Sequence, residues 1–167
     1  TAHEPTTTLD ARYSSPNSDS PPVSKAAAVL DAAEIFWLTT IRAGGRPHVT
    51  LVLAVWVEES LYYLTGETEQ KAKNSARNTH CILTTGGNTL KKGLDIVVEG
   101  DAVRRTDVSK MQPLVDHFAS KFGWHYTVRD GALVGDEGNV ALVYEVATQT
   151  VFGFGKGEPF SQTRWRF

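Results

Sequence analysis

Residues 45–74 constrain the fold most, because they read as two strands followed directly by a helix. Pro47 to Val57 and Leu61 to Thr65 are rich in β-branched and aromatic residues, which favour strands. Glu58-Glu59-Ser60 forms the turn between them, and residues 68–78 predict a short helix after the second strand. A chain with several such short strands needs a closed or layered sheet to bury them.

The rest of the chain continues this pattern of short strands separated by turn residues. Further strands are expected at Ile35–Ile41, Cys81–Thr85, Leu94–Arg105, Val140–Val146 and Thr150–Phe154, and helices at Lys25–Ala33 and Asp107–Phe122. About seven strands with two or three helices predict a mainly β protein, an antiparallel barrel with helical additions. Gly100 is expected to mark a β-bulge, and Gly123 to end the last helix. Residues 1–22 are rich in Ser, Thr, Pro and Asp and predict a flexible arm, which leaves residues 23–167 as one domain.

The long strand from Pro47 to Val57 presents two different faces. Alternate positions starting at Val49 form an uninterrupted apolar row, which favours the barrel interior. The other row, starting at His48, is small and half polar, which favours a cofactor pocket or a subunit interface. A strand buried on both sides, with Thr50 hydrogen-bonded locally, is the alternative.

Composition excludes several classes of function. The formal net charge of −2 gives no global attraction to nucleic acid. No apolar run approaches the roughly 20 residues of a membrane span, and no signal-peptide core opens the chain, so we expect a cytoplasmic protein. The single Cys81 lies in an apolar run and is expected to be a buried, reduced thiol. The histidines show no spacing typical of a metal site.

Lys71 stands at the start of the predicted helix, where free N–H groups already carry partial positive charge. A lysine there is favourable when an anion such as a phosphate binds that helix end. The same stretch resembles the cofactor-binding segment of the pyridoxamine 5'-phosphate oxidase-like, FMN-binding split-barrel family, and the resemblance covers about residues 35–167. It implies a split antiparallel β-barrel that forms a homodimer with its pocket between the subunits.

The resemblance also implies which residues bind the cofactor. Thr50, Leu51 and Val52 would line the isoalloxazine ring and ribityl chain, while Leu64, Thr65, Gln70 and Lys71 would hold the phosphate. Family members often carry arginine where this chain has Gln70. The Pro47-His48-Val49-Thr50 segment resembles actinobacterial relatives that use the deazaflavin coenzyme F-420, which adds His48 to the candidates.

The C-terminal segment is unusually rich in aromatic and cationic residues for a chain end. It resembles the tail that closes over the cofactor in the same family, which makes Arg164 and Trp165 candidates for contacts beside the ring. Pyridoxamine phosphate oxidases carry an Arg-Leu-His-Asp-Arg type of segment here, whereas this chain has Thr-Arg-Trp-Arg-Phe, so the resemblance does not extend to a vitamin B6 substrate.

The resemblance therefore implies an FMN-dependent oxidoreductase that transfers hydride at the flavin N5 to or from a small-molecule substrate. The substrate is unassigned, and no residue is named as catalytic. A deazaflavin F-420-dependent reductase is the first alternative. A non-catalytic carrier of flavin or haem on the same fold is the second.

Overall fold

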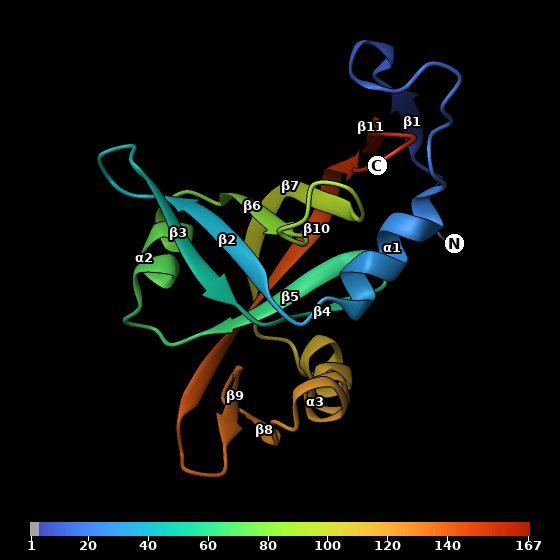
Figure 1. Cartoon of the computed structure of the whole chain (residues 1–167). Helices are drawn as coiled ribbons and strands as arrows, with labels where there is room; N and C mark the ends of the chain where they lie inside the picture. The colour runs from blue at the N-terminus through green and yellow to red at the C-terminus, as the bar shows by residue number, and fades with distance from the viewer. Residues whose placement is uncertain (1–3) are drawn as a thin grey trace.

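The computed structural model describes residues 4–167 and shows a β-barrel with helices around it (Figure 1). The elements in chain order are β1 (Thr6–Leu9), the 3-10 helix η1 (Ala11–Tyr13), α1 (Val23–Ala32), β2 (Phe36–Ile41), β3 (Pro47–Val52), β4 (Ala54–Val57), β5 (Ser60–Thr65), α2 (Gln70–Arg77), β6 (His80–Thr85), β7 (Leu94–Arg105), α3 (Val108–Phe122), β8 (Tyr126–Arg129), β9 (Ala132–Gly135), β10 (Val140–Gly155) and β11 (Ser161–Arg166).

The barrel is a ring of antiparallel strands that the chain itself closes at Leu53. Hydrogen-bonded pairing runs from β3 through β2, β6, β7, β10 and β5 to β4. β3 and β4 are consecutive pieces of one stretch, separated only by Leu53. The strand predicted over residues 47–57 is therefore broken at Leu53, where its pairing partner changes from β2 to β5. The prediction of a mainly β, split antiparallel barrel is confirmed.

β10 is one continuous strand where two strands, Val140–Val146 and Thr150–Phe154, were predicted. It pairs with different neighbours along its length. Its first half pairs with β5 and β7 in the barrel, and its second half pairs with β7 and β11. The pairing with β7 skips Gln149, so the bulge lies on β10. The prediction of a bulge at Gly100 of β7 is therefore wrong. Gly100 is required for a different reason, because a Cβ there would lie 2.5 Å from the carbonyl oxygen of Ala147.

Cross-strand register separates the two faces of the sheet. The inner face carries the barrel core in one row, formed by Leu38, Leu83, Val98, Val151 and Trp165, each at most 1% exposed. The neighbouring row on the outer face runs from Leu51 through Trp37, Thr84, Val97 and Phe152 to Arg164. We call this second set of six residues the outer row.

The two faces of residues 47–57 are the reverse of the prediction. Val49 and Leu51 point outward and are 56% and 46% exposed, whereas Val52 and Ala54 belong to the barrel core. Further along, Val55 also points outward, but it is buried in a second cluster under α3. The apolar row that starts at Val49 therefore lies partly on an exposed sheet face and partly against α3, and not in the barrel interior.

α3 packs on the lower end of the barrel together with the β8–β9 hairpin (Figure 1). Its apolar face, with Met111, Leu114 and Phe118 fully buried, covers β4 and β5. Asp107 precedes the helix and Gly123 ends it with a positive φ of 70°, as predicted. Pro113 lies within one continuous helix.

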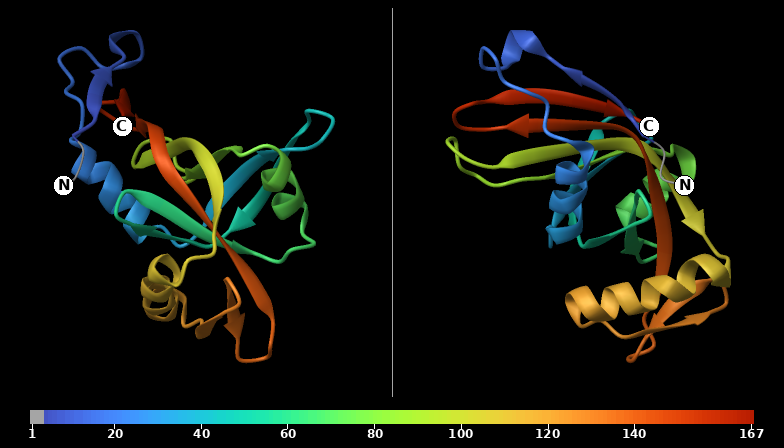
Figure 2. Two further views of the ribbon diagram at one scale, coloured as in Figure 1. Left: turned by 180° about the vertical axis from the view of Figure 1, so that it is seen from behind. Right: turned by 90° about the vertical axis from the view of Figure 1, so that its right-hand side faces the viewer.

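Both chain ends join the sheet, which corrects two expectations. Of the predicted flexible arm, residues 1–3 lie outside the described residues, but Thr6–Leu9 form β1 and pair with β11. β11 itself was not predicted, and it places the C-terminal segment in the sheet beside β10. Figure 2 shows these strands extending from the barrel on the side opposite α3.

Candidate functional site

The candidate site forms where β5 ends and α2 begins, beside the open edge of β3. The α2 helix is held across the end of the barrel by polar contacts. The Asn74 side chain donates to Thr40 Oγ1 at 3.0 Å, and Ser75 Oγ lies 3.3 Å from the hydroxyl of Tyr63. All four residues are buried. Because each buried polar group has a partner, α2 is fixed in one orientation and its first turn faces the turn after β5.

Three donors at this turn converge on one carboxylate, that of Glu69. The Gly66 amide donates to Oε2 at 2.5 Å, the Thr65 hydroxyl lies 3.4 Å from the same oxygen, and Lys71 Nζ donates to Oε1 at 2.7 Å. We call these donors, with the first turn of α2, the anion cradle. Burial opposes ionisation of Glu69, but the bonds from Lys71 and Gly66 outweigh it and hold the pKa of this carboxyl below its usual value.

Lys71 is not the solvated helix residue that is the ordinary alternative for a lysine. It is only 8% exposed, and its Nζ lies 2.7 Å from Glu69 Oε1. Gln70 extends differently, because its amide donates to Asn74 Oδ1 at 2.8 Å. The structure therefore brings Thr65 and Lys71 together as predicted, while Gln70 braces the helix instead. The Leu64 side chain packs with the cluster under α3.

His48 lies next to this arrangement on the inner face of β3. It pairs across the sheet with Thr40, the residue that accepts the hydrogen bond from Asn74. Within residues 4–167, Nδ1 of His48 is buried and has no hydrogen-bond partner. Thr50 and Val52 share its face of the strand, whereas Leu51 points to the outer face. A buried nitrogen without a partner, across the sheet from the Thr40 that holds α2, is suited to a bound polar ligand.

The two C-terminal candidates lie at the other end of the sheet. β10 pairs with both β5 and β11, but Thr65 at the end of β5 lies opposite Leu142 whereas Arg164 lies opposite Phe152, so Arg164 and Trp165 are not brought to the cradle within one chain. Trp165 is fully buried and packs closely on Gly153, where a Cβ would lie 2.7 Å from the indole. Its ring is therefore part of the core and has no free face for a cofactor, which corrects that prediction.

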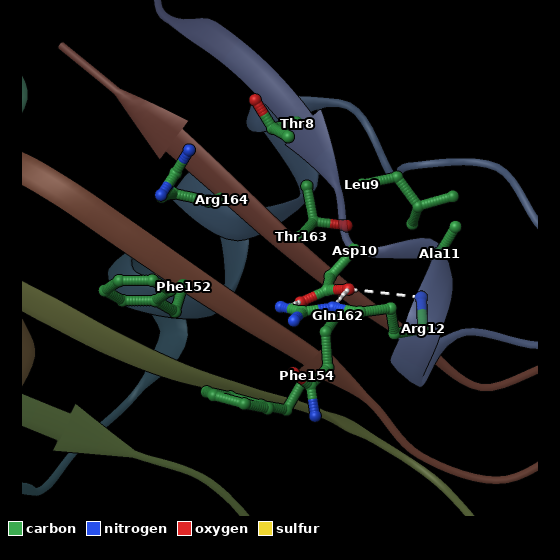
Figure 3. A pocket seen from close by; sticks show the side chains of 10 residues that line it. All are labelled: Thr8, Leu9, Asp10, Ala11, Arg12, Phe152, Phe154, Gln162, Thr163 and Arg164. Carbon is green, nitrogen blue, oxygen red and sulfur yellow. Dashed lines mark hydrogen bonds and ion pairs between the residues drawn. The ribbon is translucent and has the colours of Figure 1, made fainter.

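Arg164 lines a cleft of about 330 Å³ between the N-terminal segment and β10–β11 (Figure 3). Phe152 and Phe154 form its apolar wall. At its other side Arg12 donates two side-chain bonds to the Asp10 carboxylate, at 2.9 and 3.0 Å. In the part of the chain that the structure describes, Nε of Arg164 is buried without a hydrogen-bond partner.

Sequence reasoning did not include Glu69, Asn74 or Thr40 among the site residues. The sequence does contain a signal for Glu69, because its negative charge stands two residues before Lys71, although its side chain caps none of the free N–H groups of α2. No comparable signal identifies Thr40, because its role depends on the register between β2 and β3. Cys81 is buried as predicted, and burial raises the pKa of its thiol to about 12, so it is not a reactive group.

Neither a metal site nor a membrane-spanning helix is present in the described residues. Residues 4–167 contain no group of three or more His, Cys, Asp or Glu side chains placed to hold a metal ion. None of the helices described has both the length and the apolar character that crossing a membrane requires.

Comparison with known proteins gives the same architecture. Residues 23–151 match the sequence model of the family described as pyridoxamine 5'-phosphate oxidase. A conserved hypothetical protein from Mycobacterium tuberculosis is similar in structure, with a TM-score of 0.67 and 17% identity over 84% of this chain and 88% of that one. No curated protein matches the chain in sequence.

Two further structures are described by what they bind. A FAD-binding protein from Mesorhizobium loti has a TM-score of 0.60 and 13% identity over 98% of this chain and 99% of that one. A FAD-binding protein from Mycobacterium smegmatis has a TM-score of 0.56 and 12% identity over 86% of this chain and 94% of that one. At these identities the likeness shows the fold.

Proposed function

Because the chain belongs to the pyridoxamine 5'-phosphate oxidase family, we propose that it binds a flavin-type cofactor, FMN in the first place, and acts as an oxidoreductase. The anion cradle is the observation that carries this proposal, because its donors already bind an anionic group. The FAD-binding proteins of the same fold support a flavin as the ligand class.

The residues of the site fit such a cofactor in two respects. Thr65, Gly66 and Lys71 can donate to a phosphate as they donate to the Glu69 carboxylate, and the positive end of α2 favours the same charge. The buried, unpartnered Nδ1 of His48 can exchange a hydrogen bond with a polar group of the ligand. A bound flavin supplies hydride transfer, while these residues bind it, orient it and exclude water.

We further propose that two copies of the chain form the working unit. The cradle lies at the end of β5, opposite Leu142 of β10, and Arg164 lies opposite Phe152 at the far half of the same strand, so one chain does not bring both to the same ligand. The outer row and its neighbours expose large apolar side chains, with Ile35, Trp37, Val49 and Leu51 all between 46% and 56% exposed. A second copy of the chain could cover this apolar face, because two copies that pair through the same face remove both faces from water.

A deazaflavin of the F-420 type is the second candidate cofactor. The cradle holds a carboxylate, that of Glu69, and this cofactor carries carboxylates in its oligoglutamate tail as well as a phosphate. The protein is therefore titrated with each of the two cofactors separately, and the two affinities are compared. The small-molecule substrate is unassigned, and the C-terminal sequence from Thr163 to Phe167 speaks against a vitamin B6 phosphate.

Titration with FMN and with coenzyme F-420, followed by quenching of ligand fluorescence, tests the proposal. Lys71→Ala should weaken binding of the preferred cofactor by about 1.5–3 kcal/mol, the range for a hydrogen bond to a charged group. Lys73→Ala is the matched control, because Lys73 lies on the same helix but is exposed. Equal losses in both variants, or no binding of either cofactor by the unmodified chain, would contradict the assignment.

Turnover separates an enzyme from a carrier. Once a cofactor is identified, its reduced form should be reoxidised by a small-molecule acceptor faster in the presence of the protein than free in solution. A protein that binds the cofactor but leaves its rate of oxidation unchanged is a carrier, which would refute the oxidoreductase part of the proposal.

A further inference from the structure

The anion cradle is already filled by a side chain of the protein itself. Lys71 Nζ, the Gly66 amide and the Thr65 hydroxyl, which could all meet a phosphate, lie 2.5–3.4 Å from the two oxygens of Glu69. Lys71 is the cation of the cradle, and its charge is matched by that one carboxylate at 2.7 Å. Gln70, the next side chain, is turned away toward Asn74. The cradle with Glu69 in place therefore has no net charge left to offer a second anion.

Glu69 can nevertheless leave. Its side chain is 52% exposed while that of Lys71 is 10% exposed, so the carboxylate lies at the water-facing side and the ammonium is fixed beneath it. Rotation of Glu69 into water restores its solvation, and the donors left behind then face the ligand. A phosphate with close to two negative charges near neutral pH must either displace the carboxylate or be repelled by it.

We propose that Glu69 is a specificity-determining residue that competes with the phosphate of the cofactor. This inference rests on the proposed function, since it concerns flavin binding at the same cradle. Its consequence is a smaller preference for FMN over riboflavin than the cradle would give without Glu69, because binding the phosphate costs the bonds of Glu69.

Comparison of FMN with riboflavin isolates this effect, because the two ligands differ only in the phosphate. Glu69→Gln keeps an oxygen acceptor for the Gly66 amide and removes the charge. We expect this variant to bind FMN at least about tenfold more tightly than the unmodified chain, while riboflavin affinity changes less than about twofold. Circular dichroism and the midpoint of thermal unfolding verify that both proteins are folded.

Glu67→Gln is the matched control. It removes the same formal charge two residues earlier, from an exposed side chain that makes no hydrogen bond within the described residues. We expect FMN affinity to change less than about threefold in this variant, because exposed charges are screened by solvent and salt.

The outcomes separate the inference from the function on which it rests. A selective gain in FMN affinity for Glu69→Gln supports the inference. Equal gains for Glu69→Gln and Glu67→Gln, no gain, or an equal gain for riboflavin would overturn it while flavin binding stands. If neither the unmodified chain nor Glu69→Gln binds either flavin, the proposed function fails and this inference with it.

Discussion

At the scale of single residues, the Glu145 carboxylate on β10 accepts hydrogen bonds from side chains of both neighbouring strands, β5 and β7. Burial disfavours its ionised form, but bonds from Ser60 Oγ at 2.7 Å and Arg105 Nε at 2.8 Å outweigh burial and lower its pKa in the folded protein. The stabilisation is therefore complete above the ordinary pKa of the group, near 4.5, and is lost as pH falls through the lower folded value. We expect Glu145→Gln to lower the free energy of unfolding at neutral pH by about 1–3 kcal/mol, toward the lower end because the Arg105 side chain is 37% exposed.

Urea unfolding of Glu145→Gln from neutral pH down to about pH 3 measures this effect. The difference from the unmodified chain should shrink as the pH falls, because protonation removes the same charge in the parent. Glu137→Gln, at an exposed turn, provides the control. A difference that stays constant across the range would show that the charge of Glu145 contributes nothing to stability.

At the scale of elements, the two terminal strands make unequal contributions. β11 carries Trp165, which is fully buried, whereas β1 pairs at the sheet edge and contributes no fully buried side chain. Removing residues 161–167 should therefore abolish cooperative unfolding, and Trp165→Ala alone should cost about 3–5 kcal/mol. Removing residues 1–9 should leave a folded barrel. Circular dichroism during urea unfolding tests all three variants, and a cooperative transition for the chain ending at Phe160 would show that β11 is only a tail.

Local pattern predicted the elements whose partners are near in sequence. β7 appears with the predicted bounds, Leu94–Arg105, because its alternation is long and both ends carry turn residues. β11 was missed because its alternation is short, with only Thr163 and Trp165 buried, and because the burial of Trp165 depends on Gly153 of another strand. At the site, Lys71 was predicted from its place at the helix start and Thr65 from the family resemblance, whereas the role of Glu69 depends on how the chain turns after β5. Such geometry is tertiary and leaves no periodic signal.

At the scale of the whole molecule, the exposed apolar outer face is the feature on which the proposed dimer rests. Leu51 lies in the outer row beside Trp37, away from the barrel core. We expect Leu51→Lys to convert the proposed dimer into an 18.3 kDa monomer and to weaken flavin binding, because a charge on the proposed shared face would be buried without a partner. Light scattering with a parallel flavin titration measures both effects.

Leu90→Lys is the control for this variant, because Leu90 lies in the loop before β7 and is 83% exposed. It should leave both mass and affinity unchanged. If the unmodified chain is itself an 18.3 kDa species at micromolar concentration, the shared site is wrong. If Leu51→Lys becomes monomeric but binds flavin as before, the cradle works without a second copy.

The single residue that joins β3 to β4 has a consequence for how this sequence can change in evolution. Side chains alternate along both strands with one parity, so that Val52 and Ala54 lie inside the barrel and Leu51 and Val55 outside. One residue inserted or deleted at Leu53 would shift the alternation along β4 by one position. The β4 side chains that now point into the barrel would then point outward, and those that point outward would point in. The loop at residues 86–93 can absorb such length changes, because it follows one paired strand and precedes the next without fixing their faces. Gaps among descendants of this sequence should therefore accumulate in that loop and be purged at position 53.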